Sequence, residues 1–257
     1  MSRLQTRPQP PAQSPAAASP AAAPDLSWRA GAAGAVPVSE LYDDPYYSVT
    51  DGLAETRYNY LEAAGLPARM AGAEAFHIGE LGFGAGLATL AAWEAWRKAG
   101  DANRGTLHVT SFELHPMAAA DMARAHAAFP ELAALSAEFL PAWAAAEGEA
   151  ERRIALPGLS LRVVLGDARV TVPRTRLLAQ AWFLDGFDPR RNPALWEPAL
   201  LCAVARRTAP GGTATSYTAA GHVRRALSAA GFEVTRRPGF GTKRHMTVAR
   251  LRPEGAA

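Results

Sequence analysis

The stretch Glu80-Leu81-Gly82-Phe83-Gly84-Ala85-Gly86 decides the fold, because it joins an apolar run at residues 75–78 to a helix-like run at residues 87–93. Glycines at alternate positions let the backbone turn tightly and approach a ligand closely. The helix that follows adds free backbone N–H groups and the positive end of its dipole. The stretch therefore predicts a cofactor-binding loop between a strand and a helix. A tight turn without a ligand is the alternative.

The spacing of the glycines separates two kinds of nucleotide site. Read as the dinucleotide fingerprint G-x-G-x-x-G, the third glycine would fall at Leu87, whose side chain works against close packing of helix on strand. A nicotinamide oxidoreductase is therefore the weaker alternative. The pattern acid-x-G-x-G-x-G resembles motif I of class I S-adenosylmethionine (SAM) methyltransferases. This resemblance implies SAM as the cofactor, with Glu80 near its amino-acid end and the loop of Gly82, Phe83, Gly84 and Gly86 beneath it.

Strand and helix signals alternate along the rest of the chain. Apolar runs occupy residues 75–81, 107–112, 161–165, 181–184 and 213–217, and helix-like runs occupy residues 87–97, 117–128, 194–207 and 219–230. Continuous apolar runs are typical of strands buried on both faces, and their alternation with helices is typical of βαβ units. We therefore predict an α/β, Rossmann-like class I methyltransferase fold, with a mostly parallel sheet and helices on both faces.

Length and composition limit the other possibilities. A chain of 257 residues with 49% hydrophobic content can form one sizeable domain. Its single cysteine, Cys202, excludes an intrachain disulfide and a cysteine-rich zinc site, and we expect no metal. The N-terminus lacks a secretory signal and no stretch of 18 apolar residues occurs, so we expect a cytoplasmic protein without a membrane partner.

The N-terminal segment differs in composition from the rest. Residues 1–37 are rich in Pro, Ala and Ser and have no sustained period, so we predict a disordered tail there. The methyltransferase domain is then expected to span residues 38–257.

Acidic residues follow three further predicted strands, where ligands of open α/β sheets bind. Glu113 follows the second strand and is the predicted ligand of the ribose hydroxyls. Asp167 follows the third and is expected to accept the adenine amino group, while the Ala168 backbone N–H donates to a ring nitrogen. Asp185 follows the fourth and is expected to face the transferred methyl group. A solvated acid at Glu113 and a plain Gly-Asp turn at Asp167 are the alternatives.

Motifs outside this scaffold are more specific. They are residues 51–58, residues 182–189 with Asn192-Pro193 and Trp196, residues 219–225 and residues 239–246. Together with the glycine loop they resemble the MnmC/MnmD methyltransferase family, in order, over about residues 38–251. The resemblance implies a tRNA substrate and N-methylation of the 5-aminomethyl group of 2-thiouridine at the wobble position, giving 5-methylaminomethyl-2-thiouridine.

The chain departs from the familiar members of this family at three positions. Thr and Asn often occupy the positions of Ala85 and Ala88, and an aromatic residue often stands where His222 is. Bifunctional members also carry a flavin-dependent oxidoreductase domain that unmasks the amine. The resemblance therefore implies a stand-alone methyltransferase, with separate enzymes supplying the 5-aminomethyl group.

Charge is distributed unevenly along the chain. The net charge is +3, but residues 201–257 contain ten Arg or Lys and two Glu. Such a basic segment can attract a phosphate backbone, although a solvated basic surface is the alternative. A base in a single-stranded loop also needs aromatic side chains for stacking. The candidate substrate-binding residues are Glu55, Arg57, Tyr58, Phe187, Arg224, Lys243 and Arg244.

The chemistry requires a neutral amine. An alkylamine with a pKa near 10.4 is neutral in under about 0.1% of molecules at pH 7. We therefore expect Asp185 to orient the amine and stabilise the developing cation, and to accept a proton only secondarily. Two other functions remain open. One is a class I methyltransferase of another amine substrate; the other is a non-catalytic RNA-binding protein with a SAM fold, which the Ala85 and Ala88 departures would favour.

Overall fold

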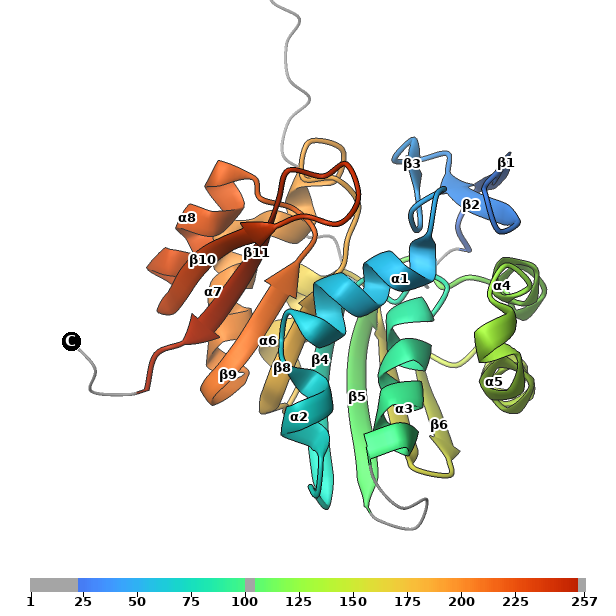
Figure 1. Cartoon of the computed structure of the whole chain (residues 1–257), viewed down its shortest axis with the longest axis horizontal. Helices are drawn as coiled ribbons and strands as arrows, with labels where there is room; N and C mark the ends of the chain where they lie inside the picture. The colour runs from blue at the N-terminus through green and yellow to red at the C-terminus, as the bar shows by residue number, and fades with distance from the viewer. Residues whose placement is uncertain (1–22, 100–104, 254–257) are drawn as a thin grey trace, which may run out of the picture.

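The computed structural model describes residues 23–99 and 105–253, and its centre is an eight-stranded sheet (Figure 1). The strand order is β10-β11-β9-β8-β4-β5-β7-β6. The five central strands β9, β8, β4, β5 and β7 are mutually parallel, whereas β6, β10 and β11 are antiparallel additions at the two edges. The strands are β4 (Ala75–Leu81), β5 (Thr106–Glu113), β6 (Glu151–Leu156), β7 (Leu159–Leu165), β8 (Ala179–Leu184), β9 (Thr208–Ser216), β10 (Phe232–Pro238) and β11 (His245–Leu251).

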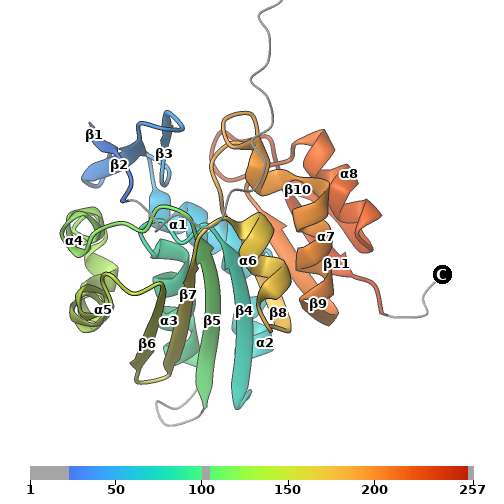
Figure 2. The same ribbon diagram turned by 180° about the vertical axis from the view of Figure 1, so that it is seen from behind.

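Helices cover both faces of this sheet, as Figures 1 and 2 show from opposite sides. On one face, Phe76 and Ile78 pack in a core with α1 (Gly52–Thr56), η1 (Arg57–Glu62), α2 (Leu66–Met70), α3 (Leu87–Ala99), α4 (Ala119–His126) and α5 (Ala133–Ala145). On the other face, Leu81 and Trp182 pack with α6 (Ala168–Arg174), α7 (Pro198–Arg206) and α8 (Gly221–Ala229). The short 3-10 helix η2 (Pro130–Leu132) packs on the first face, and η3 (Pro193–Trp196) packs on the second. The prediction of a Rossmann-like α/β fold is confirmed.

The single helix predicted over residues 194–207 is two helices in the structure. The 3-10 helix η3 ends at Trp196, and α7 begins at Pro198 after an extended Glu197. Proline suits the first position of a helix because its missing N–H needs no partner there, but it disfavours a helical conformation in the residue before it. A continuous helix is therefore interrupted at this point.

The N-terminal segment forms a small antiparallel sheet, which corrects the prediction of disorder up to residue 37. Strand β1 (Leu26–Ala30) pairs along its length with β2 (Ala35–Ser39), and β2 pairs with β3 (Asp44–Pro45). Val36 is buried, and the Arg124 guanidinium lies 4.1 Å from the centroid of the Trp28 ring. Hydrogen-bonded pairing and these contacts outweigh a composition typical of disorder. The part of the predicted tail at residues 1–22 lies outside the described residues.

Helix length also bears on whether the chain could span a membrane. Across residues 23–99 and 105–253, no helix is both long and apolar enough to cross a bilayer.

Candidate active site

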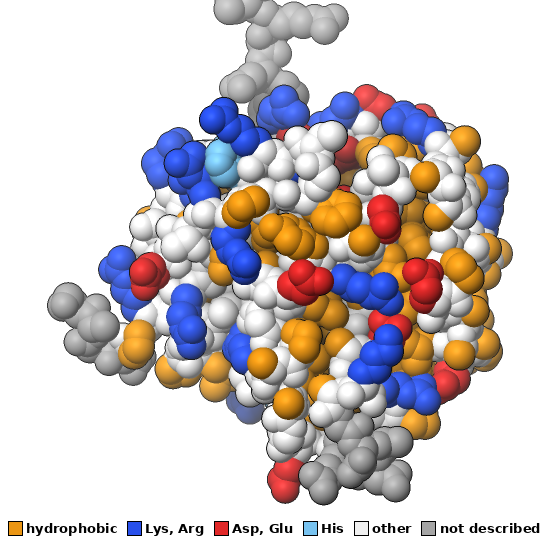
Figure 3. Space-filling view, viewed as in Figure 1, with side chains coloured by type: hydrophobic (Ala, Val, Ile, Leu, Met, Phe, Trp, Pro, Cys, Tyr) orange, Lys and Arg blue, Asp and Glu red, His pale blue; other side chains and the backbone are white. Residues whose placement is uncertain are grey.

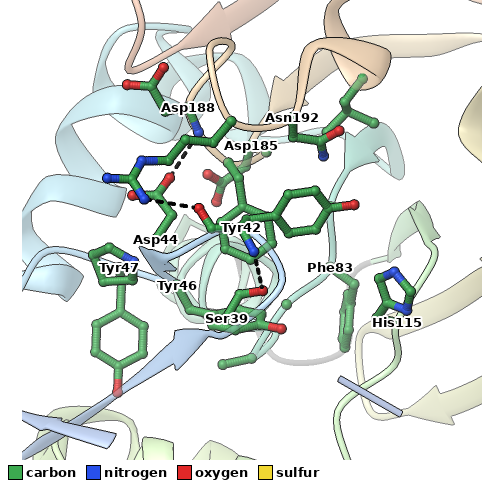
Figure 4. Close-up of a pocket in the computed structure, with 18 of the residues that line it drawn as sticks. Ser39, Tyr42, Asp44, Tyr46, Tyr47, Phe83, His115, Asp185, Asp188 and Asn192 are labelled. Carbon is green, nitrogen blue, oxygen red and sulfur yellow. Dashed lines mark hydrogen bonds between the residues drawn. The ribbon is translucent and has the colours of Figure 1, made fainter. Parts of the chain in front are cut away.

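A cavity of 1260 Å³ lies at the carboxyl edge of the parallel strands, under the N-terminal sheet (Figure 4). Its walls come from the loops after β4, β5, β7 and β8 and from residues 23–50. Figure 4 shows Tyr42, Asp44, Asp185 and Asp188 grouped on one side, facing Phe83 and His115 across the pocket. The cavity is therefore large enough for a nucleoside cofactor and the reacting part of a second molecule.

The glycine loop touches the loop that carries Asp185. Gly82 has φ +81°, and a Cβ atom there would lie 2.0 Å from the Asp185 carbonyl oxygen. The Asp185 N–H in turn donates to the Leu81 carbonyl at 3.0 Å. A residue other than glycine would force these two loops apart. Glycine is therefore required at position 82 both for the positive φ and for the close approach of the two loops. Gly84 also lines the cavity, and its φ of +54° continues the turn.

Glu113 lies at the end of β5, where the ribose ligand was predicted. One of its carboxylate oxygens accepts hydrogen bonds from the N–H groups of Phe83, at 2.9 Å, and Gly84, at 3.0 Å. The other accepts from the His115 N–H at 2.7 Å. A carboxylate offers about four acceptor positions, so capacity remains for a further donor. Glu113 thus ties the glycine loop to the end of β5 and faces the cavity.

Asp167 and Ala168 line the cavity after β7, as predicted. The Asp167 carboxylate caps α6 by accepting from the Arg169 N–H at 2.8 Å, and it pairs with the Arg169 guanidinium at 2.6 Å. Hydrogen bonds and the charge of Arg169 outweigh the effect of burial and lower the pKa of Asp167. This carboxylate therefore stays ionised and in a fixed orientation beside the cavity.

Glu80 does not line this cavity, and its expected position near the amino-acid end of the cofactor stays a prediction. It is 1% exposed, and Thr89 on α3 donates to its carboxylate at 3.2 Å. Burial, reinforced by the charge of Asp185, raises its pKa to about 8 despite hydrogen-bond donors nearby. The side chain of this β4 residue points beneath the loop, so its role in the described structure is to support the loop.

Asp185 is half-buried at the cavity wall, among polar side chains from four other segments. Burial raises its pKa to about 7, and the negative charge of Glu55 raises it further, against the opposing effects of Tyr60 and Lys243. The Lys243 ammonium pairs with Glu55 at 2.6 Å and lies 4.6 Å from the centroid of the Tyr217 ring. Around Asp185 the cavity therefore combines carboxyl groups with the Lys243 ammonium and the phenols of Tyr60 and Tyr217.

Only some of the predicted substrate-binding residues line the cavity. Glu55, Phe187 and Lys243 line the cavity, whereas the described side chains of Arg57, Tyr58, Arg224 and Arg244 do not. Arg57 pairs with Glu94 at 2.7 Å. The Tyr58 hydroxyl donates to the Pro238 carbonyl at 3.0 Å, and Arg224 donates to the Ala219 carbonyl at 3.2 Å. Arg244 is exposed.

Several residues of the cavity wall were not identified from the sequence. Tyr42, Tyr46 and Asp44 come from the N-terminal segment, and Asn59 and Tyr60 come from the π-helix η1. Single π-helical turns are frequent at functional sites, but sequence patterns do not reveal them. Asn59 and Tyr60 directly follow the family-like segment at residues 51–58, which was the available signal for η1. The N-terminal residues lie at the edge of a segment that composition assigned to disorder.

The three departures from the family pattern lie in different places. Ala85 and Ala88 line the cavity, and the Ala85 carbonyl lies 2.7 Å from Nε2 of the buried His126. His222 is exposed at the start of α8, outside the cavity wall. The described residues hold no cluster of three or more side chains suited to a metal ion.

The chain resembles known proteins in both sequence and structure. A family model described as S-adenosyl-L-methionine-dependent methyltransferase matches residues 130–252. The bifunctional MnmC protein of tRNA 5-methylaminomethyl-2-thiouridine biosynthesis from Caulobacter vibrioides is 44% identical over 234 residues, which are 90% of this chain and 38% of the relative. The MnmC protein of Cupriavidus necator is 42% identical over 86% of this chain and 34% of the relative.

The solved structure of MnmC2 from Aquifex aeolicus matches with a TM-score of 0.73 and 25% identity, over 90% of this chain and 71% of that one. The chain is similar to MnmC methyltransferases over 90% of its length. It has the class I methyltransferase fold, and SAM is the cofactor named by the family model that it matches. A spermidine synthase, with a TM-score of 0.55 and 13% identity, shares the fold alone. The chain spans about two-fifths of the length of the bifunctional MnmC relatives.

Proposed function

We propose that this chain transfers a methyl group from SAM to the 5-aminomethyl group of (2-thio)uridine at the tRNA wobble position, giving 5-methylaminomethyl-2-thiouridine. The observation that supports this most strongly is the 44% identity to an MnmC protein over 90% of the chain. The product named for that relative is a secondary amine on a uridine. The cavity therefore has to accommodate an amine beside the methyl donor.

The residues of the cavity fit SAM. Gly82 and Gly84 line the cavity without a side chain, and Glu113 and Asp167 stand at the ends of adjacent strands. We assign Glu113 to the ribose hydroxyls, Asp167 and Ala168 to the adenine, and the loop of Gly82, Phe83, Gly84 and Gly86 to the remainder. When bound, SAM supplies a methyl group already activated on a sulfonium.

The acidic end of the cavity fits an amine. A primary amine that attacks with its lone pair has two N–H donors to be satisfied. Asp185 is one acceptor, and Asn59, whose buried Oδ1 has no partner in the described structure, is a second. Glu55 is neutralised by Lys243 in this arrangement. A substrate that arrives as an ammonium therefore finds in Asp185 a carboxylate that is not tied up in an ion pair.

Asp185 performs two tasks in this mechanism. Because its pKa lies at about 7, it can accept a proton from the substrate ammonium more readily than an ordinary aspartate. As a carboxylate it orients the neutral amine and stabilises the positive charge that grows on nitrogen during attack. Tyr60 and Tyr217 help to exclude water from this end of the cavity, since both are largely enclosed beside Asp185.

The test uses purified protein, SAM and tRNA that carries 5-aminomethyl-2-thiouridine, followed by mass spectrometry of the nucleosides. We expect a mass increase of one methyl group at that nucleoside and none in tRNA with unmodified uridine at the wobble position. Methylation of small amines at comparable rates, with no transfer to tRNA, would instead favour a methyltransferase of another amine substrate. SAM binding without any transfer would favour the non-catalytic RNA-binding alternative.

The proposal also requires a source of the primary amine. Separate enzymes would have to supply the 5-aminomethyl group, because the chemistry assigned to this cavity only adds a methyl group to nitrogen. Mass spectrometry of wobble nucleosides from cells with and without the gene tests this step. Loss of the methylated nucleoside with accumulation of the 5-aminomethyl form is the expected result.

A further inference from the structure

The turn of residues 40–46 begins directly after β2 and includes the short strand β3. It is bound to the loop that carries Asp185. The Asp44 carboxylate accepts a hydrogen bond from the Asp188 N–H at 2.8 Å. The Arg191 guanidinium donates to the Tyr42 carbonyl at 3.0 Å, to the Asp43 carbonyl, and to the Asp43 carboxylate at 2.6 Å. These contacts join segments that lie almost 150 residues apart in the chain. They hold the turn across the mouth of the cavity (Figure 4).

Tyr42 is the side chain that this turn places over the cavity. Its ring stacks on Phe187, with centroids 4.7 Å apart and an interplanar angle of 30°. Its centroid also lies 6.5 Å from that of His115, in the loop after β5. Burial raises the pKa of Tyr42, and the negative charges of Glu113 and Asp167 raise it further. Tyr42 therefore lies near the acidic residues that follow β5 and β7 and contacts Phe187 in the loop that carries Asp185.

The backbone of the turn adopts a conformation that needs support. Asp43 has φ +47°, the one positive φ among the non-glycine residues that the structure describes. The left-handed conformation costs roughly 1–2 kcal/mol outside glycine and persists only where the surroundings fix it. The Arg191 contacts to both the carbonyl and the carboxylate of Asp43 supply that restraint. The turn is thus held shut by specific contacts.

We propose that residues 40–46 form a latch over the bound cofactor, with Tyr42 as a further cofactor-contacting residue and Asp44 and Arg191 holding the latch closed. A tyrosine suits this position because its ring can cover the apolar face of an adenosine while its hydroxyl reaches the neighbouring polar groups. Closure also shields the methyl donor from water. SAM entry and S-adenosylhomocysteine release then require the latch to open. The inference depends on SAM as cofactor and is independent of the methyl acceptor.

The test measures the dissociation rate of S-adenosylhomocysteine by stopped-flow displacement, without tRNA. Arg191→Ala removes contacts between charged groups, so it should speed release by about tenfold or more. Tyr42→Ala should do the same, whereas Tyr42→Phe keeps the ring and should retain most of the slow release. Arg190→Ala is the matched control, because Arg190 is 86% exposed and pairs with Asp188 inside its own loop. This control should leave the release rate unchanged.

A second measurement on the unaltered protein covers the case in which a variant does not fold. Hydrogen exchange at the backbone amides of residues 40–46 should slow when the protein is saturated with S-adenosylhomocysteine, because the ligand then lies beneath the latch. Unchanged exchange in this segment would overturn the proposal. A folded Arg191→Ala variant that releases the product at the wild-type rate would overturn it as well.

Discussion

At Asp185, burial changes the chemistry that a carboxylate can carry out. An ordinary aspartate with a pKa near 3.9 is a poor acceptor for a proton from an ammonium. The enclosed position of Asp185 beside Glu55 raises its pKa to about 7. Asp185 is thus a stronger base than the sequence suggested, where positioning was expected to come first and proton acceptance second. The two roles become comparable at neutral pH.

The substitution Asp185→Asn tests these roles. The amide keeps the shape and one acceptor oxygen but loses the charge, so we expect the methyl-transfer rate to fall by about 10²- to 10⁴-fold while SAM binding is retained. The wild-type rate should rise with pH through about 7, as Asp185 loses its proton. In the variant this step should vanish, and only the increase from deprotonation of the substrate amine should remain. Single-turnover kinetics on modified tRNA measure both effects, and a loss below about threefold would refute the mechanism.

Glu80 shows how a buried acid at a cofactor loop acts on stability. Its pKa is raised to about 8, so the folded protein holds a proton that the unfolded chain releases near pH 4.5. The stabilisation is therefore full below about pH 4.5 and is lost as pH rises through about 8. Asp185 has the same effect on stability: its contribution is lost as the pH rises from its ordinary pKa to about 7.

We expect the free energy of unfolding to fall by up to a few kcal/mol between pH 5 and pH 9, at about 1.4 kcal/mol for each unit of pKa change. Glu80→Gln, which cannot ionise, should remove the larger share of this dependence. Chemical denaturation of both proteins at pH 5, 7 and 9 measures it. Parallel stability curves for wild type and variant would show that Glu80 does not hold the proton.

Among the structural elements, the central strands could be predicted and the edge strands could not. Strands β4 and β8 are largely apolar because most of their residues are buried, and β5 and β7 alternate buried apolar residues with less buried ones. Strand β9 is rich in Thr and Gly and was predicted only from residue 213 onward. Strand β10 has the sequence Phe-Glu-Val-Thr-Arg-Arg-Pro with four exposed residues at its end, and β6 begins Glu-Arg-Arg, so neither shows an apolar run. Helix α5 is rich in alanine and contains Pro141, which hides its helical period.

The same distinction holds for the site. Glu113, Asp167 and Asp185 were predictable because they directly follow buried strands, and the ends of parallel strands meet at one edge. Glu55, Lys243 and Tyr42 come from a short helix, the β10–β11 loop and the N-terminal turn. They meet only in the folded chain, and no spacing in the sequence connects them. Glu80 lies outside the cavity wall because adjacent strand residues point to opposite faces, and its contact with the cofactor stays a prediction.

The contact between the glycine loop and the Asp185 loop can be tested by Gly82→Ala. Gly72 provides a matched control, because its φ is +73° but a Cβ atom there would meet nothing within 4 Å. Gly72→Ala should therefore show only the cost of the left-handed backbone, about 1–2 kcal/mol. Gly82→Ala should lose more stability and also SAM affinity, because the new Cβ meets the Asp185 carbonyl. Denaturation and calorimetry with SAM distinguish the two variants. Equal effects would mean that the loop contact is unimportant.

At the scale of the whole molecule, the basic C-terminal region lies beside the cavity mouth. Figure 3 shows Lys and Arg side chains gathered over α8 and the nearby ends of β10 and β11. Tyr58 on η1 packs against this region, because its hydroxyl contacts Pro238 and its ring lies 5.8 Å from that of Phe240. Under the proposed function, a tRNA bound here places its anticodon loop at the cavity. Exposed basic side chains of this surface include Arg225, Arg236, Arg237, Lys243 and Arg244.

Lys243 and Arg244 are adjacent in sequence but face different surroundings. Both side chains are exposed, but Lys243 pairs with Glu55 and lines the cavity, whereas Arg244 does not line it. The expectation that both residues bind phosphate stays a prediction, and the ion pair with Glu55 favours a different role for Lys243. Under the proposed function, only Arg244 belongs to the phosphate-binding surface, and Lys243 acts on the electrostatics of the methyl-transfer pocket.

The last prediction follows from this difference. Arg244→Ala should weaken tRNA binding and reduce the slope of log affinity against log salt by up to about one, because one phosphate contact is lost. Lys243→Ala should leave that slope unchanged but slow methyl transfer, because Glu55 loses its counter-ion beside Asp185. Arg97→Ala, at the far end of α3 and paired with Glu138, is the control that should alter neither quantity. Filter binding at several salt concentrations and single-turnover kinetics separate these effects. If Arg97→Ala lowers the slope as much as Arg244→Ala, the attraction comes from total charge, and the C-terminal surface is not a specific tRNA site.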